Sequence, residues 1–425
     1  MMYFERGSKT DVITADDTRA ILKQVFDAMG PRKRVLAIPP DFTRFNSYAG
    51  PITEMVNDYF GDALTDIMPA LGTHSPMSDE QLSVMFPSVP KDKFRVHDWR
   101  NDIVTVGTVP GSYVKEVSEG RLDYEMNAQV NKLLLDPSFD LILSIGQVVP
   151  HEVIGMANYT KNIFVGVGGS DFINKSHFIG ASYGMERIMG RAKSPVRDVF
   201  EYAKVHFLQD VPIVYVLTVR AKDEATGEMV TRGLYIGDDF ECFQKAADLS
   251  LATNFIMVER EIKKCIVYLD PEEFKSTWLG NKSVYRTRMA LADDAELVVL
   301  APGLKEFGED KTIDGLIRKY GYKGTPHTLE CTNANADLQA NLGASAHLIH
   351  GSSEGRFRIT YCPGDGMSRE EIEGVGFGYC HYNDMVARYP LDQLKDGWNV
   401  VDGEEVYYIS NPALGLWAYP DRFKD

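Results

Sequence analysis

The chain has 425 residues, of which 44% are hydrophobic, and its formal net charge at neutral pH is −16. A chain of this length exceeds what one ordinary hydrophobic core serves, so we expect two or three domains. The negative charge disfavours nucleic acids and acidic membrane surfaces as partners, because phosphate contacts require clustered lysine and arginine. No stretch approaches the roughly eighteen apolar residues of a membrane span, and the first residues lack the pattern of a signal peptide. We therefore expect a cytoplasmic protein.

The first half of the chain alternates predicted strands and helices. Residues 34–38 form an apolar run that stops at two prolines, which predicts a strand that ends in a loop. Residues 51–60 have helical spacing, and Ser78 with the acidic residues after it has the capping chemistry of another helix start. Residues 66–71 lead into a Gly-Thr-His loop, and residues 141–145 form a further apolar strand. Ligand sites in open parallel sheets lie at the carboxyl ends of strands, so the polar residues that follow these strands could share one crevice.

The second half repeats the pattern. Residues 211–219 have strong β character and precede a hairpin or loop at 225–227, and residues 265–269 and 297–301 read as strands with a helix around 313–320. We therefore expect an α/β fold of two α/β domains with an active-site cleft between them, the second domain being Rossmann-like. The predicted N-terminal domain spans residues 1–265 and carries the catalytic and cofactor motifs. The C-terminal domain spans residues 266–425, and its last residues could pack back on the first domain.

The five cysteines form no Cys-x-x-Cys pair: Cys242, Cys265, Cys331, Cys362 and Cys380. An odd and widely scattered set predicts reduced packing residues, and neither a disulfide framework nor a zinc ribbon.

Four polar residues follow the predicted strands of the first half. Arg44 could hold a carboxylate in a bidentate fork with Asp41 orienting it, although an Asp/Arg pair that stabilises a loop is the simpler interpretation. His74 and His151 could act as general acid and base, since the pKa of histidine lies near neutrality. One isolated histidine in a turn is more often bonded to backbone. Only the pair, each after a predicted strand, favours catalysis.

Lys161 precedes the apolar run at residues 162–167, which we read as a strand. Desolvation there would lower the pKa of its amine and make it nucleophilic, whereas a solvated surface lysine is the plain alternative. Gly168 and Gly169 could let backbone N–H groups approach a phosphate, or could form an ordinary turn. His177 has an imidazole suited to nickel, zinc or copper but no thiolate or carboxylate beside it, so a metal held mainly by an organic cofactor fits best.

Taken in order, these motifs resemble the lactate racemase family, whose members carry a nickel-pincer nucleotide. The resemblance rests on five features: Asp-x-Thr-Arg from Asp41, Gly-x-His ending at His74, Pro-His ending at His151, a lysine ten residues later and a histidine sixteen further. The resemblance implies that Lys161 carries the pincer pyridinium (a pyridinium-3,5-bisthiocarboxylic acid mononucleotide) covalently and that His177 is the nickel ligand.

The resemblance also implies roles for the other motif residues. Arg44 would bind the substrate carboxylate, Asp41 would lie near the nucleotide, and His74 and His151 would be the acid/base pair on opposite sides of the substrate. The implied reaction is racemisation or epimerisation of a 2-hydroxy acid, with hydride leaving the carbinol carbon and returning to either face of a planar 2-oxo acid. The protein would then be an isomerase with a small-molecule substrate; its oligomeric state cannot be predicted.

The sequence departs from the family pattern at two places. Residues 158–160 replace a glycine-rich run that contains arginine, so Lys175 or the Gly168-Gly169 turn could anchor the phosphate instead. In the second domain, Lys311 falls at the expected spacing of a substrate-binding lysine, but its neighbours differ from the family's Tyr-Gln pair. The substrate is therefore expected to be larger than lactate.

A polar segment at residues 347–356 could bind the extra hydroxyl or carboxylate groups of such a substrate, for example an aldonate or a dicarboxylate. Ser353, Glu354 and Arg356 are the candidate contacts. The alternative is a helix end and turn, with His347 and His350 one helical turn apart on a surface.

Two other classes of protein remain compatible with the residues. A zinc- or manganese-dependent hydrolase or aldolase could use His74, His151 and His177 as ligands. A non-enzymatic binding protein could hold a small molecule in the cleft, but such proteins are usually exported and the chain shows no export signal.

Overall fold

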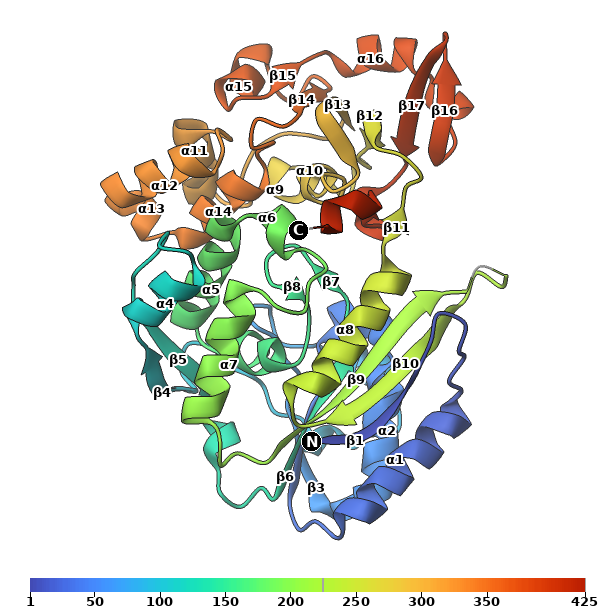
Figure 1. Cartoon of the computed structure of the whole chain (residues 1–425), viewed down its shortest axis with the longest axis vertical. Helices are drawn as coiled ribbons and strands as arrows, with labels where there is room; N and C mark the ends of the chain where they lie inside the picture. Colours follow the sequence, from blue (N-terminus) through green and yellow to red (C-terminus); the bar gives the residue numbers. More distant parts are fainter. Residues whose placement is uncertain (224, 425) are drawn as a thin grey trace. The chain divides into compact units, whose positions relative to one another are not determined.

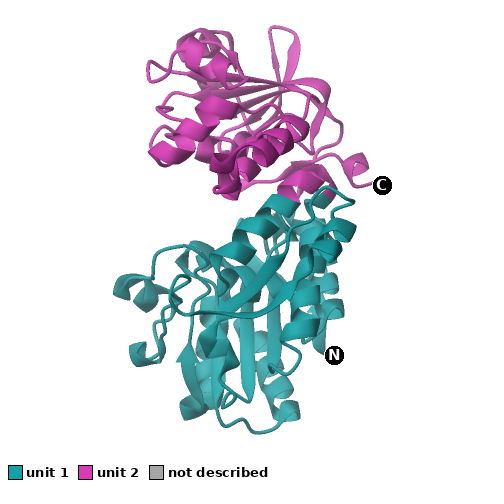
Figure 2. Cartoon of the chain, turned by 90° about the vertical axis from the view of Figure 1, so that its left-hand side faces the viewer, with its two compact units in different colours: residues 1–179, 188–254 teal, residues 180–187, 255–425 magenta. Residues whose placement is uncertain are grey.

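The computed structural model describes residues 1–223 and 225–424, which divide into two compact units. Unit 1 comprises residues 1–179 and 188–254, and unit 2 comprises residues 180–187 and 255–425 (Figure 2). The boundary expected between residues 265 and 266 falls inside a strand of unit 2, β12 (Ile262–Tyr268). Residues 180–187 join unit 2 although unit 1 surrounds them in the sequence.

Unit 1 is built on a six-stranded sheet in the order β1-β10-β9-β6-β2-β3 (Figure 1). Its central part is parallel, because β9, β6, β2 and β3 run in one direction, while β10 and β1 add an antiparallel edge. The strands are β1 (Met2–Gly7), β2 (Val35–Ile38), β3 (Leu64–Ile67), β6 (Leu141–Gln147), β9 (Ile213–Lys222) and β10 (Met229–Gly237).

The parallel strands follow a doubly wound order. The chain runs from β2 outward to β3 and then returns to the other side of β2 for β6 and β9. The strand order therefore reverses between β2 and β6, and a crevice opens beyond the carboxyl ends of strands at such a point. Both strands are buried along their length except at Gln147, the last residue of β6.

Helices and two small hairpins complete unit 1. The helix α1 buries Ile21, Leu22, Val25 and Phe26, and a capping box at Thr14 fixes its start. The helices are α1 (Ala15–Met29), α2 (Ala49–Phe60), α3 (Asp79–Met85), α4 (Gly111–Val117), α5 (Ser170–Tyr183), α6 (Met185–Ile188), α7 (Pro195–Phe207) and α8 (Phe240–Asn254), with α5 and α6 reaching into residues 180–187. The short strands are β4 (Ile103–Val109), β5 (Met126–Asn131), β7 (Pro150–His151) and β8 (Gly155–Met156).

Unit 2 has its own six-stranded sheet in the order β15-β14-β13-β12-β17-β16. All neighbours are parallel except the edge strand β16, and the order reverses between β12 and β17, as a Rossmann-like sheet requires. The strands are β12, β13 (Leu291–Ala301), β14 (Arg358–Pro363), β15 (Gly378–Tyr379), β16 (Gly397–Val401) and β17 (Glu404–Ile409). A separate pair joins β11 (Ile256–Met257) to β18 (Trp417–Ala418), so the C-terminal strand pairs within this unit.

Both faces of this second sheet carry a buried apolar cluster. The helices of unit 2 are α9 (Thr277–Gly280), α10 (Lys282–Tyr285), α11 (Lys311–Tyr320), α12 (Thr325–Ala334), α13 (Ala336–Gln339), α14 (Leu342–His350), α15 (Arg369–Gly374) and α16 (Tyr382–Arg388). The predicted α/β class is confirmed for the chain.

One predicted element is wrong. Residues 162–167 are not a strand: Asn162–Gly166 form a π-helix that continues a helical turn at Thr160 and Lys161. Four of its residues are buried, and a short apolar run that is buried on all sides has no periodicity that separates a strand from a helix. The Asn162 side chain donates to the Ile38 carbonyl and the Ser144 hydroxyl, which ties this helix to β2 and β6.

Within residues 1–223 and 225–424, no helix has both the length and the apolar character that crossing a bilayer requires.

Candidate active site

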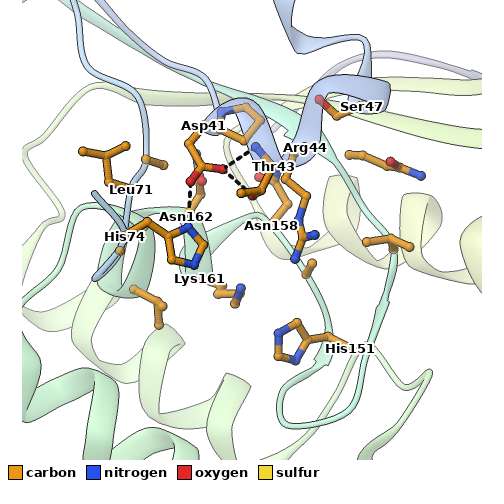
Figure 3. Close-up of a pocket in the computed structure, with 18 of the residues that line it drawn as sticks. Asp41, Thr43, Arg44, Ser47, Leu71, His74, His151, Asn158, Lys161 and Asn162 are labelled. Atoms are coloured by element: carbon orange, nitrogen blue, oxygen red, sulfur yellow. Dashed lines mark hydrogen bonds and ion pairs between the residues drawn. The ribbon is translucent and has the colours of Figure 1, made fainter. Parts of the chain in front are cut away.

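A pocket with a cavity volume of about 270 Å³ opens at the carboxyl ends of β2, β3 and β6. Every residue that lines it belongs to unit 1. Figure 3 draws 18 of the lining residues as sticks. Its polar lining residues are Asp41, Thr43, Arg44, Ser47, Thr73, His74, Gln147, His151, Asn158, Lys161, Asn162 and His177. The sequence prediction that the residues after these strands share one crevice is therefore confirmed within this unit.

Asp41 and His74 form a hydrogen-bonded pair. Asp41 caps the 3₁₀ turn Phe42–Ser47 that follows β2, and its buried carboxylate lies 2.7 Å from His74 Nδ1. Burial would raise the pKa of Asp41, but hydrogen bonds from His74 and Thr43 outweigh it and hold that pKa below its usual value. An ionised carboxylate only accepts, so Nδ1 carries a proton, and in the neutral form of the ring Nε2 holds a lone pair.

His151 has the opposite tautomer. It ends β7 in a short hairpin, and its Nδ1 accepts the backbone N–H of Val153 at 3.1 Å. Neutral His151 therefore carries its proton on Nε2. The pocket thus contains one imidazole that can take a proton at Nε2 and one that can give a proton there, which is the complement that acid/base transfer needs.

Arg44 extends into the pocket from the turn after β2. Its backbone N–H is bonded to the Asp41 carbonyl at 3.0 Å, and its side chain points toward the same space as Lys161 and His151 (Figure 3). Among residues 1–223 and 225–424, no side chain or carbonyl pairs with its guanidinium. A cationic fork without a protein carboxylate is suited to bind a ligand carboxylate bidentately.

Lys161 lies in the floor of the pocket, next to the π-helix. Burial, and then the positive charge of Arg44, lower the pKa of its amine from 10.5 to about 8. In the described part of the chain its amine has no hydrogen-bond acceptor. The expected desolvated environment is present, although it is provided by a helix and a loop rather than by a strand.

The backbone that leads to Lys161 is strained and is held by a buried arginine. Asn158 and Tyr159 both have left-handed backbone conformations, with φ of 68° and 59°, which are unfavourable for residues with a side chain. Arg197 of α7 donates to the carbonyls of Met156 and Asn158 at 2.7 Å and 3.2 Å and to the Thr160 hydroxyl at 2.8 Å. These bonds fix the loop immediately before Lys161.

His177 lies on α5 and lines the same pocket. Its Nδ1 is 2.7 Å from the carbonyl oxygen of Ile173, which can only accept, so Nδ1 carries the proton and Nε2 holds a lone pair. Burial and then the charge of Lys161 lower its pKa to about 4, so the ring is neutral near pH 7. A neutral imidazole whose other nitrogen is bonded to a backbone carbonyl has the geometry typical of a metal ligand.

A comparison with models of known protein families finds a match. Residues 18–186 match the lactate racemase N-terminal domain, and this range contains every motif residue from Asp41 to His177. The resemblance drawn from the spacing of the motifs is therefore confirmed.

Solved structures share the fold over nearly the whole chain. A Thermotoga maritima protein solved by a structural genomics consortium superposes with a TM-score of 0.75 at 21% identity, covering 97% of this chain and 99% of that one. The lactate racemase apoprotein of Thermoanaerobacterium thermosaccharolyticum gives a TM-score of 0.63 at 14% identity, covering 94% and 92%. At such identities the likeness establishes the fold alone. A comparison with curated protein sequences finds no significant match.

Within the matched range of residues 18–186, Gly168 and Gly169 do not line the pocket. A Cβ on Gly168 would lie 1.9 Å from the Phe164 carbonyl oxygen, and one on Gly169 would lie 2.4 Å from Gln129 Oε1. Close packing thus accounts for both glycines. Lys175 pairs with Asp171 at 2.7 Å and is also absent from the lining. Phosphate anchoring by any of the three stays a prediction.

The candidate residues of unit 2 have contacts of their own. Glu354 accepts from Thr325 and Ser352, and Arg356 pairs with Glu186 at 3.0 Å and with Asp293 at 2.9 Å. Ser353 accepts a backbone bond from Arg356, and Lys311 is the exposed first residue of α11. None of them lines the pocket of unit 1. Their part in substrate binding stays a prediction.

The segment around His347 and His350 is the end of α14 followed by a turn, as one of the two interpretations expects. Its placement on a surface is wrong, because both histidines are buried. His347 Nε2 is 2.9 Å from the Tyr322 hydroxyl, and its ring lies 4.3 Å from that of Trp278.

Sequence reasoning missed several residues that shape the pocket. Asn158 lines the pocket and has a left-handed backbone conformation, and Asn162 bonds to β2 and β6. Arg197 does not line the pocket but donates to the loop before Lys161. An Asn at a positive φ is a known preference, but nothing in a single sequence shows which Asn is so placed. In the described residues, no group of three or more His, Cys, Asp or Glu side chains is arranged to hold a metal.

The packing role of Gly168 can be tested by stability. Gly168→Ala forces a methyl group against the backbone of Phe164. We therefore expect thermal denaturation to show a free energy of unfolding that is lower by about 1–3 kcal/mol, as for other overpacked sites. Gly315→Ala is the control: Gly315 is exposed on α11 with no atom within 4 Å of the added methyl group, so the variant should be neutral or stabilised by roughly 0.5–1 kcal/mol. Unchanged stability of the Gly168 variant would leave the glycine available for a ligand role.

The Lys161 environment predicts an unusual titration. Pulse labelling with an amine-reactive reagent across pH, read by peptide mass spectrometry, should show Lys161 reactivity rising through a pKa of about 8. Lys319 is the internal contrast, because its bond to the Asp337 carboxylate raises the pKa of its amine. Arg44→Met should move the Lys161 midpoint upward by removing a nearby positive charge. An Lys161 midpoint near 10.5 in the native protein would contradict the assignment.

Proposed function

We propose that this protein is an isomerase that inverts the hydroxyl-bearing C2 carbon of a 2-hydroxy acid, with a nickel-pincer nucleotide attached through Lys161. One observation carries the proposal. A lysine with a lowered amine pKa and a metal-competent histidine line one pocket together with an arginine that has no partner in the described chain and two histidines whose Nδ1 atoms have opposite hydrogen-bond roles. The lactate racemase N-terminal domain over residues 18–186 supports it.

The residues present fit such a cofactor. Lys161 offers an amine without an acceptor in the described chain, and His177 offers the Nε2 lone pair of a neutral imidazole. A metal that takes its other ligands from an organic group needs only one protein ligand, which agrees with the lack of a cluster of ligating side chains in the described residues. When bound, the group would supply a reversible hydride acceptor beside nickel.

Arg44 would bind the carboxylate common to all 2-hydroxy acids. Its fork matches a carboxylate bidentately and leaves the substrate C2 atom to lie toward the two histidines. The pocket also keeps Asp41 from competing for the guanidinium, because the Asp41 carboxylate is bonded to His74 and Thr43. The guanidinium of Arg44 would therefore be available to pair with the carboxylate of the substrate.

The histidines would move the hydroxyl proton. For one enantiomer, His74 Nε2 takes the proton of the 2-hydroxyl as the C2 hydrogen leaves as hydride, and the Asp41 carboxylate stabilises the resulting imidazolium. The planar 2-oxo acid can receive hydride on either face. His151 Nε2–H then protonates the oxygen as it becomes a hydroxyl of the other hand, and the roles reverse in the opposite direction.

The proposed substrate is larger than lactate. The carboxylate-binding motif at Arg44 is retained, whereas the residues around Lys311 differ from the family pattern at the far end. A site that bonds substrate hydroxyls discriminates strongly against analogues that lack them, since its own polar groups are then unpaired. Ser353, Glu354 and Arg356 remain the proposed contacts for a polyhydroxy or dicarboxylic acid.

Attachment through Lys161 is tested by mass. Protein produced together with the enzymes that make the cofactor should carry nickel and a covalent adduct on the peptide that contains Lys161. Lys161→Ala should lose the adduct, and Lys132→Ala, which removes an exposed lysine paired with Asp102, should keep it. An adduct that persists in Lys161→Ala would refute the attachment.

Nickel binding has its own matched control. His177→Gln should lose nickel while keeping the adduct. His206→Gln should retain both, because His206 makes the same bond to the carbonyl four residues earlier on α7, at 2.8 Å, but lies outside the pocket. Equal nickel content in the two variants would contradict the assignment of His177 as ligand.

The acid/base pair is tested on the loaded enzyme. Replacing His74 or His151 by Ala should lower turnover by about 10²–10⁴-fold, the usual contribution of a positioned acid or base. Inversion at the C2 carbon should be measured over a panel of 2-hydroxy acids from lactate to aldonates and dicarboxylates. Near wild-type turnover in both variants would make the histidines structural, and a highest kcat/KM for lactate would overturn the proposed substrate size.

A further inference from the structure

We propose a second chemistry for the same pocket: when its amine carries no group, Lys161 reacts reversibly with 2-oxo acids to form an imine. The reaction does not involve nickel or a nucleotide. It rests on the proposed function in sharing Arg44 as the carboxylate site and His74 and His151 as base and acid, and it can succeed or fail independently of cofactor attachment.

The first requirement is an amine that is uncharged and reachable. Lys161 lines an open pocket, and no described residue accepts a hydrogen bond from it. The charges around it are those of Arg44 and Arg197, which oppose protonation, and of Glu152 and Asp41, which favour it. Asp41 is already bonded to His74, so this carboxylate of the pocket is not available to pair with the amine.

The lowered pKa of Lys161 supports this step. At a pKa of about 8, roughly a tenth of the amine is neutral at pH 7, which is about 300-fold more than at the ordinary value of 10.5. A neutral amine is the nucleophile in imine formation, and lysines that perform this chemistry are desolvated or lie beside another cation. Lys161 has both features, because burial and Arg44 are the two largest causes of its shift.

The second requirement is a means of holding the acid beside the amine. The Arg44 guanidinium points into the same space as the Lys161 amine and has no partner in the described chain (Figure 3). In a 2-oxo acid the C2 carbonyl carbon is bonded directly to the carboxylate carbon. A carboxylate bound by Arg44 would therefore hold the C2 carbon in the same space as the amine. The cavity of about 270 Å³ lies just below the range of about 300–1,000 Å³ typical of small-molecule pockets, so it has room for a short 2-oxo acid such as pyruvate.

The third requirement is proton transfer at two atoms, and the two histidine tautomers meet it. The Lys161 nitrogen attacks the carbonyl carbon, and the carbonyl oxygen takes the proton from His151 Nε2 while His74 Nε2 removes the extra proton from nitrogen. The resulting carbinolamine then loses its hydroxyl group with one more proton as water, and the C=N bond forms. Amine and 2-oxo acid thus give imine and water, with no change in oxidation state.

The test uses the full chain produced without added nickel and without cofactor-synthesis enzymes. The protein is incubated with pyruvate and sodium cyanoborohydride, which reduces an imine to a stable secondary amine, and is analysed by intact mass and peptide mapping. We expect one reduced pyruvate per chain, on the peptide that contains Lys161. Lys161→Ala should lose this label, whereas Lys132→Ala should keep it, because Lys132 is an exposed lysine that does not line the pocket.

Arg44→Met separates a specific site from a merely reactive lysine. Loss of a charged carboxylate contact should raise the pyruvate concentration for half-maximal labelling by roughly 10–100-fold. Labelling by propionaldehyde, which has no carboxylate, should respond far less, and this comparison also shows that the variant is folded. His151→Asn should slow trapping at saturating pyruvate, by about 10²-fold or more for a lost general acid.

Three results would overturn the proposal: label spread over surface lysines, label that survives Lys161→Ala, or equal pyruvate dependence with and without Arg44. Protein that already carries the covalent adduct should show no trapping. Trapping in the adduct-free chain together with no adduct under any condition would support the imine chemistry and refute cofactor attachment. An adduct at Lys161 without trapping in the adduct-free chain would refute only the imine chemistry.

Discussion

The pocket depends on one buried cation, Arg197. Its side chain is completely buried, and its bonds run to two backbone carbonyls and a threonine hydroxyl of the loop before Lys161. Burial lowers the pKa of this guanidinium to about 10, so it remains charged at neutral pH. Its Cζ atom also lies 4.2 Å from the centre of the Phe243 ring, which adds a favourable cation–π contact.

This arrangement explains how a strained loop persists. Two consecutive non-glycine residues at positive φ each cost of the order of 1–3 kcal/mol and survive only where the surroundings fix them. Arg197 disfavours other loop conformations, because any other path would leave its buried Nη1 and Nη2 groups without these acceptors. Glu201 on the next turn of α7 accepts from Tyr159 and Thr160 and closes the network. Lys161 is thus presented by a rigid backbone although it follows a loop.

The sheet accounts for the convergence of the other groups. Strand order reverses between β2 and β6, so the Asp41–Arg44 turn and the Gln147–His151 segment leave adjacent strands at the same edge. Each histidine is then held by a different partner. A buried carboxylate holds His74 at Nδ1 and leaves its Nε2 as a proton acceptor, and a backbone N–H holds His151 as a donor. These two local hydrogen bonds favour complementary tautomers of the two rings.

The parts of the structure that were predictable have strong local signals. The strand at 34–38 ends at two prolines, and the helix after Ser78 begins with a capping box that the structure retains. The pocket residues Asp41, Arg44, His74, His151, Lys161 and His177 could be identified because their spacing is specific as a set, although each motif alone is weak.

The parts that could not be predicted depend on tertiary contacts. The run at 162–167 has no helical or strand period, and its π-helix is set by the bonds of Asn162 to β2 and β6. Arg197 lies 36 residues beyond Lys161 in an ordinary amphipathic helix, so its burial is invisible without the fold. In the sequence, Gly168 resembles part of a phosphate-binding loop. The carbonyl oxygen that excludes a side chain at this position becomes apparent only in three dimensions.

The same property of Lys161 serves both proposed chemistries, and this links them. Forming a covalent bond to a nucleotide cofactor requires a neutral amine, as does forming an imine, so the lowered pKa of Lys161 favours both proposed reactions. Imine formation is reversible in water, whereas the attached cofactor would be retained. A 2-oxo acid would therefore delay loading by competing for the Lys161 amine, but would not prevent it. Because a 2-oxo acid is also the planar species of the proposed racemisation, the adduct-free protein would recognise the same compound that the loaded enzyme forms.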